Sequence, residues 1–238
     1  MTDLLLISNS TVYGRGYLEH VGDEIRDILG GRRAVLFFPY ALHDMDSYAA
    51  KARDRFDALG FQLQSIHQFE RARRKAAVLS AEAFFIGGGN TFRLLNALYR
   101  DDLLSAIREK FATGTPYIGS SAGSNVAGPT IKTTKDMPII QPPSFDALGI
   151  FAYQISPHFQ DPDPTSKHMG ETQEERILQF LEENTTPVVG LREGSWIRQK
   201  NGTAVLEGPH QARVFRRGVA PQEVDAGTDL NRSLEPRP

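Results

Sequence analysis

The 238-residue chain contains no cysteine, which excludes disulfide bonds, a thiol nucleophile and cysteine-ligated zinc. It has little net charge, formally -2, and one dense basic cluster at Arg71, Arg73, Arg74 and Lys75. That cluster is typical of a solvated helix face, so we expect no nucleic-acid partner. No apolar run approaches the roughly 18 residues that cross a bilayer. We therefore expect no membrane contact and a cytoplasmic location.

Enough hydrophobic residues are present, 40% of the chain, to bury a sizeable core in one domain. After Gly218 the composition shifts to proline, charged residues and serine, with few apolar side chains. Such a composition cannot bury enough apolar surface to offset the entropy of ordering. We expect one domain over residues 1–217 and a mobile tail over residues 218–238.

Short apolar runs alternate with amphipathic segments along the first 190 or so residues. This alternation indicates an α/β fold with three layers, in which helices cover both faces of a mostly parallel sheet. The Asn201-Gly202 pair adds a small C-terminal β-hairpin region, because this dipeptide favours a tight turn. Strands are predicted at 4–7, 34–38, 61–66, 83–86, 116–118, 154–159, 188–191, 196–198, 204–206 and 213–215, and helices at 18–29, 48–59, 72–79, 92–99, 103–112 and 172–181.

A Gly-x-Ser-x-Gly pattern follows the strand predicted at 116–118, over residues 119–123. Small residues on both sides of a serine are typical of a nucleophile elbow, in which bulkier neighbours would clash and block the hydroxyl. This interpretation makes Ser121 the candidate nucleophile. The alternative is a glycine and serine turn with no catalytic role.

A serine hydroxyl needs an adjacent base, usually an imidazole, to attack at neutral pH. His158 ends a predicted strand, and Pro157 fixes the backbone just before it. A single histidine at a strand end is often structural, but the elbow serine favours His158 as the base.

Two carboxylates are candidates for the group that orients the base. Asp136 would give the chain order serine, acid, histidine, and Glu193 the order serine, histidine, acid. Triads are recognised by geometry and not by order, so the residues alone leave both open. Each could instead pair with a neighbouring cation on the surface.

An acyl-transfer site also needs backbone N–H groups directed at the developing oxyanion. The N–H of Ala122 is one candidate, and the glycine turn at 87–89 is the other. A glycine turn before a helix could instead bind phosphate. The spacing matches neither nucleotide-binding motif, so we expect no cofactor, and the sequence predicts no metal site.

Seven ordered segments resemble the S51 family of serine peptidases: 4–10, 87–92, 117–123, 133–139, 157–159, 170–172 and 193–197. The resemblance covers roughly residues 3–217 and implies a fold similar to class I glutamine amidotransferases, with serine in place of their cysteine. It assigns the nucleophile to Ser121, the base to His158 and the oxyanion donors to Gly89 and Ala122. Analogy with the amidotransferases favours Glu193 over Asp136 as the third member.

The family is associated with hydrolysis of dipeptides that begin with aspartate, through an acyl-enzyme that would form on Ser121. A pocket for aspartate needs a cation, preferably arginine. The family pattern has arginine after 170–172, where this chain has Gln173. We therefore expect weaker discrimination against Asn-X dipeptides, unless Lys132, Lys135, Arg176 or a second subunit supplies the charge. Asn90 is a further candidate for substrate binding, and the resemblance suggests a homodimer.

Other functions compete with this one. Another S51 activity, such as cyanophycinase-like cleavage of β-aspartyl bonds or a carboxypeptidase, would use the same machinery. A non-catalytic binding module would keep Ser121 only as a relic. A general esterase of the α/β-hydrolase type would need His210 as its base, in a region with no supporting motif.

Overall fold

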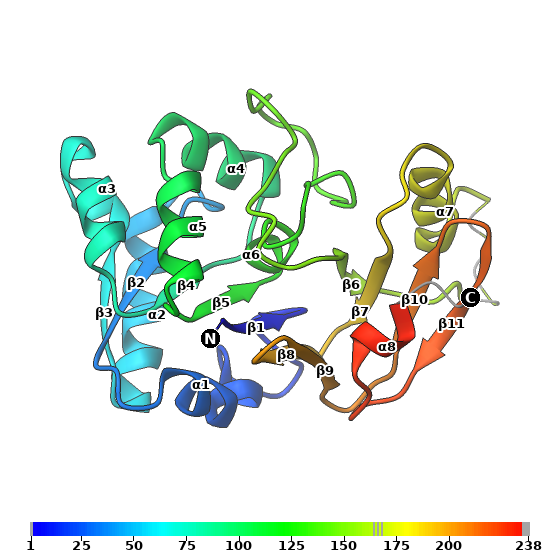
Figure 1. Cartoon of the computed structure of the whole chain (residues 1–238), viewed down its shortest axis with the longest axis horizontal. Helices are drawn as coiled ribbons and strands as arrows, with labels where there is room; N and C mark the ends of the chain where they lie inside the picture. The colour runs from blue at the N-terminus through cyan, green and yellow to red at the C-terminus, as the bar shows by residue number, and fades with distance from the viewer. Residues whose placement is uncertain (1, 164, 166, 168, 235–238) are drawn as a thin grey trace.

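The computed structural model describes residues 2–163, 165, 167 and 169–234. Within this part of the chain the larger of two sheets has seven strands in the order β3-β2-β4-β5-β1-β8-β9 (Figure 1). The first five strands in this order are parallel to one another. Strand β8 is antiparallel to β1, and β9 is antiparallel to β8. The strands of this sheet are β1 (Asp3–Ile7), β2 (Ala34–Phe38), β3 (Gln62–Ser65), β4 (Phe84–Ile86), β5 (Tyr117–Ser120), β8 (Trp196–Lys200) and β9 (Thr203–Glu207).

Helices cover both faces of this sheet, as the alternation of apolar runs predicted. One face carries α1 (Gly22–Leu29) and α2 (Met45–Leu59). The other carries α3 (Arg71–Ser80), α4 (Thr91–Arg100), α5 (Leu104–Ala112) and the short α6 (Ala122–Asn125). Short 3₁₀ turns at Glu19–Val21 and Ile66–Gln68 precede α1 and α3.

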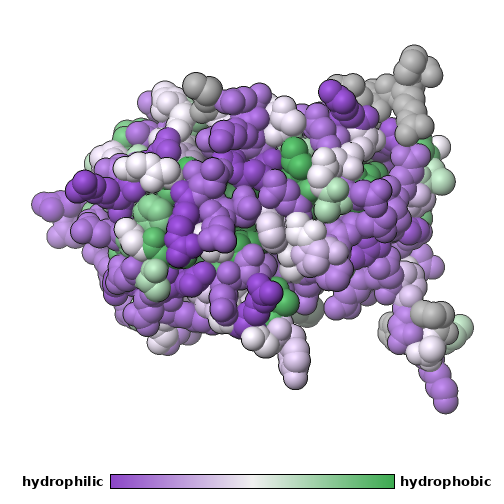
Figure 2. Space-filling model, turned by 90° about the horizontal axis from the view of Figure 1, so that it is seen from below, coloured by the Kyte–Doolittle hydropathy of each residue, from purple (hydrophilic) through white to green (hydrophobic). Residues whose placement is uncertain are grey.

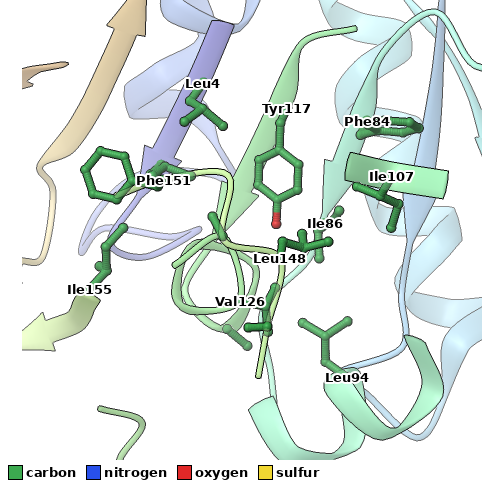
Figure 3. Packing of buried hydrophobic residues seen from close by; sticks show 14 of the residues in the cluster. Leu4, Phe84, Ile86, Leu94, Ile107, Tyr117, Val126, Leu148, Phe151 and Ile155 are labelled. Atoms are coloured by element: carbon green, nitrogen blue, oxygen red, sulfur yellow. The ribbon is translucent and has the colours of Figure 1, made fainter. Parts of the chain in front are cut away.

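Two apolar cores result, one on each face. Successive side chains of a strand point to opposite faces, so Leu4 and Leu6 of β1 enter one core while Leu5 and Ile7 enter the other. Figure 3 shows the first core, in which Tyr117 of β5 lies among side chains from α4, α5 and the loop after α6. Because β1 to β5 are parallel, their carboxyl ends lie at one edge of the sheet, and the two cores pack against both faces of these strands.

The second sheet has the order β11-β10-β7-β6 and lies beside the first, at the right of Figure 1. It consists of β6 (Gln154–Phe159), β7 (Val188–Arg192), β10 (Ala212–Arg216) and β11 (Val219–Val224). Helix α7 (Gln173–Glu183) packs on it through Ile177 and Leu181. Only β6 and β7 are parallel to each other.

The hairpin around Asn201 forms as predicted, and it extends the large sheet because β8 pairs with β1. The loop between α6 and β6 is anchored to the core by buried Ile131, Leu148 and Phe151.

The end of the chain differs from the tail predicted over residues 218–238. Strand β11 pairs with β10, and α8 (Leu230–Leu234) buries Leu230 and Leu234 in the main core. The prediction is wrong for residues 219–234, because backbone pairing and two leucines are enough to anchor a polar segment. Residues 235–238 lie outside the described part.

No described helix combines the length and the apolar character that spanning a membrane requires. The face seen in Figure 2 is mostly hydrophilic, with small separated patches of hydrophobic residues.

Candidate active site

Ser121 lies on a sharp turn between β5 and α6, with φ 53° and ψ -111°. A residue with a side chain rarely adopts this conformation, which stores strain at the turn. The flanking glycines are required by close packing: a Cβ on Gly119 would lie 2.6 Å from the carbonyl oxygen of Gly123, and one on Gly123 would overlap the carbonyl oxygen of Ile86. The Gly-x-Ser-x-Gly pattern therefore forms the elbow that the sequence predicted.

The hydroxyl of Ser121 meets His158 across the space between the two sheets. Its Oγ lies 2.8 Å from Nε2 of the imidazole, within ordinary hydrogen-bond distance. Ser121 comes from the large sheet and His158 from β6 of the small one. The packing of the two sheets thus determines whether these two side chains can meet.

The backbone of His158 is unusual and is held from both sides. Its φ is 53°, and the pairing of β6 with β7 shifts register between Pro157 and Phe159. A bulge of this kind redirects a side chain. The N–H of His158 donates to Oγ of Ser8 at 2.9 Å, and its carbonyl accepts from Nζ of Lys135 at 2.9 Å.

Of the two candidate carboxylates, Glu193 contacts the base. Its Oε1 lies 2.6 Å from Nδ1 of His158, on the side of the ring away from Ser121. Asp136 instead accepts hydrogen bonds from the backbone N–H and the hydroxyl of Thr91, at 2.7 and 2.5 Å. Among the described hydrogen bonds and ion pairs, none joins Asp136 to His158. The structure therefore does not bring Asp136 into the position of an orienting acid, because it is bound at the first turn of α4.

The glycine turn after β4 lies directly against the nucleophile. A Cβ on Gly88 would come within 2.9 Å of Cβ of Ser121, so only glycine fits there. The N–H of Gly88 donates to the hydroxyl of Tyr48 at 2.9 Å and is already used. Within the described residues, no hydrogen-bond acceptor faces the N–H of Gly89 or Ala122. These two predicted donors are the ones left free for a ligand.

A pocket of about 770 Å³ opens at this point. It contains Ser121, His158, Glu193 and Asp136, and it continues away from them toward the first turns of α2. The rest of its wall comes from the segments after β1 and β2, the glycine turn and α2: Asn9, Ser10, Thr11, Tyr17, Leu42, His43, Asp44, Ser47, Tyr48, Lys51, Gly88 and Gly89.

Three of the predicted substrate-binding residues lie elsewhere. Lys132, Gln173 and Arg176 line a separate pocket of about 80 Å³ between the loop after α6 and α7. Gln173 accepts hydrogen bonds from Lys135 and from the N–H of Gln160. The residues are polar and close in sequence to the site, but their side chains are not directed into the pocket beside Ser121.

The side chain of Asn90 is also engaged in hydrogen bonds within the protein. Its side-chain oxygen caps α4 by accepting from the N–H of Arg93, and its side-chain nitrogen donates to the carbonyl of Met137. Its position beside the glycine turn is therefore structural in this conformation.

Several supporting residues were not found by sequence reasoning. Ser8 binds the His158 backbone and donates to the carbonyl of Leu191 at 2.8 Å. Asn9 accepts from the N–H of Gly194, beside Glu193, at 2.7 Å. Two polar residues directly after a buried strand were the available signal, because ligands bind at the carboxyl ends of parallel strands.

Clusters of three or more histidine, aspartate and glutamate side chains placed to hold a metal ion do not occur in the described part of the chain. The chemistry that the arrangement can perform is nucleophilic attack by Ser121 with proton transfer through His158.

The chain is similar to known peptidases over most of its length. The model of peptidase family S51 matches residues 4–206. Peptidase E of Streptomyces coelicolor is 50% identical over 99% of this chain and 96% of its own, and a probable alpha-aspartyl dipeptidase of Drosophila melanogaster is 43% identical over 98% of each chain.

Two solved structures share the fold. A putative peptidase E of Listeria monocytogenes aligns with a TM-score of 0.66 at 21% identity, covering 88% of this chain and 99% of its own. A peptidase from an acI-B1 actinobacterium aligns with a TM-score of 0.72 at 18% identity, covering 96% of each chain. On the match to the family model and the identity to these relatives, the chain belongs to peptidase family S51.

Proposed function

We propose that this chain is a serine-type dipeptidase that hydrolyses dipeptides with an N-terminal aspartate. The observation that carries the proposal is the continuous contact from Ser121 through His158 to Glu193, at 2.8 and 2.6 Å. The names of the relatives, peptidase E and probable alpha-aspartyl dipeptidase, supply the substrate class.

In the first half-reaction, Oγ of Ser121 attacks the carbonyl carbon of the peptide bond while its proton passes to Nε2 of His158. The negative oxygen that forms accepts hydrogen bonds from the N–H groups of Gly89 and Ala122. His158 then donates the same proton to the leaving nitrogen as the C–N bond breaks. The second residue departs as a free amino acid, and the aspartyl group remains as an ester on Ser121.

In the second half-reaction, water replaces the leaving amine. His158 takes a proton from the water, whose oxygen attacks the ester, and returns the proton to Oγ of Ser121 as the C–O bond breaks. Glu193 accepts a hydrogen bond from the Nδ1–H of His158 throughout, which keeps Nε2 directed at the reacting atoms and stabilises the imidazolium.

Hydrolysis of Asp-p-nitroanilide by the wild type and by Ser121→Ala tests the proposal. The wild type should release nitroaniline, and Ser121→Ala should fall to background, a loss of about 10³-fold or more in kcat. Full activity in Ser121→Ala would refute the acyl-enzyme on Ser121, and an inactive wild type would refute the substrate class.

A panel of Asp-Leu, its β-aspartyl isomer and a longer peptide separates the competing S51 activities. Cleavage of the β-aspartyl isomer alone would support a cyanophycinase-like enzyme, and release of single residues from the carboxyl end of the longer peptide would support a carboxypeptidase. A non-catalytic module would leave all three intact.

A homodimer and a cytoplasmic location, both expected from the sequence, complete the proposal. Light scattering on the purified chain and fractionation of the producing cells would test them.

A further inference from the structure

The pocket beside Ser121 extends along one face of α2. Asp44, Ser47, Tyr48 and Lys51 are spaced three or four residues apart, so their side chains share one side of the helix and line the pocket together. No part of the catalytic mechanism uses this wall. It is also the part of the pocket in which a side chain of the substrate could be held.

The hydroxyl of Tyr48 can donate a hydrogen bond to a ligand. It accepts hydrogen bonds from the N–H of Gly88 at 2.9 Å and from the hydroxyl of Tyr17 at 3.4 Å. These two bonds occupy both lone pairs of the Tyr48 oxygen, so its own O–H is left for a ligand in the pocket. Burial raises the pKa of both tyrosines, and Tyr48 is therefore a neutral donor near neutral pH.

Lys51 supplies a positive charge next to this donor. Its Nζ lies 4.7 Å from the centre of the Tyr17 ring, a cation–π contact that holds the ammonium over the pocket. No described carboxylate pairs with Lys51, and it is the one lysine or arginine among the described residues of the pocket wall. The carboxylates in the wall are engaged elsewhere: Asp44 caps α2, Asp136 binds Thr91 and Glu193 binds His158.

The position of Lys51 relative to His158 indicates which half of the substrate Lys51 would contact. The leaving nitrogen must face Nε2 of His158, and His158 comes from β6, which packs into the core on one face of the large sheet through Ile155. Tyr48 belongs to the core on the opposite face. Ser121 lies between them at the edge of the sheet. The acyl half of the dipeptide, which carries the aspartate side chain, therefore lies toward α2.

We propose that the O–H of Tyr48 and the ammonium of Lys51 form the subsite that binds the side-chain carboxylate of the N-terminal aspartate. This inference rests on the proposed function and names its specificity residues. It differs from the expectation drawn from Gln173, because the charge that compensates the aspartate comes from α2 and not from α7. Strong preference for Asp-X over Asn-X follows, since asparagine offers no negative charge to Lys51.

The test compares kcat/KM for Asp-Leu and Asn-Leu in the wild type, Lys51→Met, Tyr48→Phe and Arg53→Met. Lys51→Met should reduce the Asp-to-Asn preference at least about tenfold, mainly through a higher KM for Asp-Leu. Tyr48→Phe should reduce the preference by a smaller factor. Arg53→Met is the matched control, because Arg53 carries the same charge on the same helix but contacts Gln68 outside the pocket, and it should keep the wild-type preference.

Asp-Leu with an amide at its carboxyl end tests which carboxylate of the substrate Lys51 binds. If Lys51 binds the side chain, Lys51→Met should lose the same factor on Asp-Leu and on its amide. A loss seen only with free Asp-Leu would mean that Lys51 binds the carboxyl end of the substrate, and an unchanged Asp-to-Asn preference in Lys51→Met would also overturn the subsite. Both outcomes leave the proposed function intact, whereas an inactive wild type would remove the function itself.

Discussion

Oε1 of Glu193 lies 2.6 Å from Nδ1 of His158, which belongs to β6, and Glu193 directly follows β7, the neighbouring strand of the small sheet. His158 and Glu193 thus both come from the small sheet, and together they contact Ser121 of the large sheet through the imidazole. Asp136 approaches from the loop after α6 and ends at the first turn of α4, where it binds Thr91. The two carboxylates therefore have different partners, the imidazole of His158 for Glu193 and the start of α4 for Asp136.

Replacing the two carboxylates in parallel should distinguish the effects of these contacts. Glu193→Gln should reduce kcat by about 100-fold or more, because an amide neither fixes the tautomer of His158 nor stabilises its positive form. Asp136→Asn should reduce kcat less and cost about 1 kcal/mol of stability, because an acidic group is lost at the start of α4. Steady-state kinetics and thermal unfolding measure both effects.

Proton NMR gives an independent readout for the same pair. The strongly hydrogen-bonded Nδ1 proton of His158 should give a downfield signal in the wild type and in Asp136→Asn, and this signal should be absent in Glu193→Gln. The reverse pattern would make Asp136 the orienting acid.

The elbow should not tolerate a single added methyl group. Gly123→Ala would drive its Cβ into the carbonyl oxygen of Ile86 and should destabilise the protein by about 2 kcal/mol or more. Gly31→Ala is the control, because no atom lies within 4 Å of its Cβ position, and it should leave stability unchanged or raise it by up to about 1 kcal/mol. Urea unfolding of both variants would measure the difference. Equal stability would show that the turn is not packed as described.

Local patterns were enough to predict the sharp turn at Ser121 and most strands, and they singled out His158, which lies 2.8 Å from Oγ of Ser121. Ser121 is surrounded by glycines whose absent side chains are a local requirement, and buried strands such as 4–7 are continuous apolar runs. Analogy with the amidotransferases favoured Glu193 over Asp136, but its contact with His158 depends on how β6 pairs with β7. Pairing between distant strands is not recorded in either segment alone.

The lining of the pocket beside Ser121 could not be predicted for a related reason. Tyr48 and Lys51 form an ordinary face of a surface helix in the sequence, and only the position of α2 over the edge of the sheet directs them into the pocket. Conversely, Gln173 and Arg176 match the surroundings of a family motif, yet α7 places them in a different pocket. The motifs therefore located Ser121 and the histidine that contacts it better than they located the residues that line the pocket.

Lys135 should make stability depend on pH in the alkaline range. Burial lowers its pKa from 10.5 to about 8, although its ammonium donates to the carbonyls of Pro157 and His158 and to Gln173. Between these two values the unfolded chain binds more protons than the folded one, so the free energy of unfolding rises with pH. Relative to that of Lys135→Met, the free energy of unfolding of the wild type should rise by on the order of 3 kcal/mol between pH 8 and 10.5. Below pH 8 the difference between the two proteins should change little.

Urea unfolding of both proteins at pH 7, 8, 9 and 10.5 measures this gain. All other groups titrate in both proteins, so the difference isolates Lys135. A difference that stays constant or falls over this range would mean that the ammonium remains charged in the folded state.

The C-terminal segment should contribute measurably to stability. Leu230 of α8 is fully buried in the main core, although the surrounding sequence is polar. Leu230→Ala should lower the free energy of unfolding by about 2–4 kcal/mol, because it removes buried methyl groups and leaves a cavity. Val219→Ala, at a side chain that is 42% exposed, should cost less than about 1 kcal/mol.

The same segment supports the site through one pair of charges. Glu223 of β11 binds the guanidinium of Arg192 through both carboxylate oxygens, at 2.8 and 2.9 Å, and Arg192 directly precedes Glu193. Ending the chain at Gly218 would remove this anchor together with the two buried leucines. The shortened chain should unfold at lower urea concentration and, while still folded, hydrolyse Asp-p-nitroanilide more slowly than the full chain. Wild-type stability and activity in the shortened chain would show that the segment after Gly218 is dispensable, as its composition alone suggests.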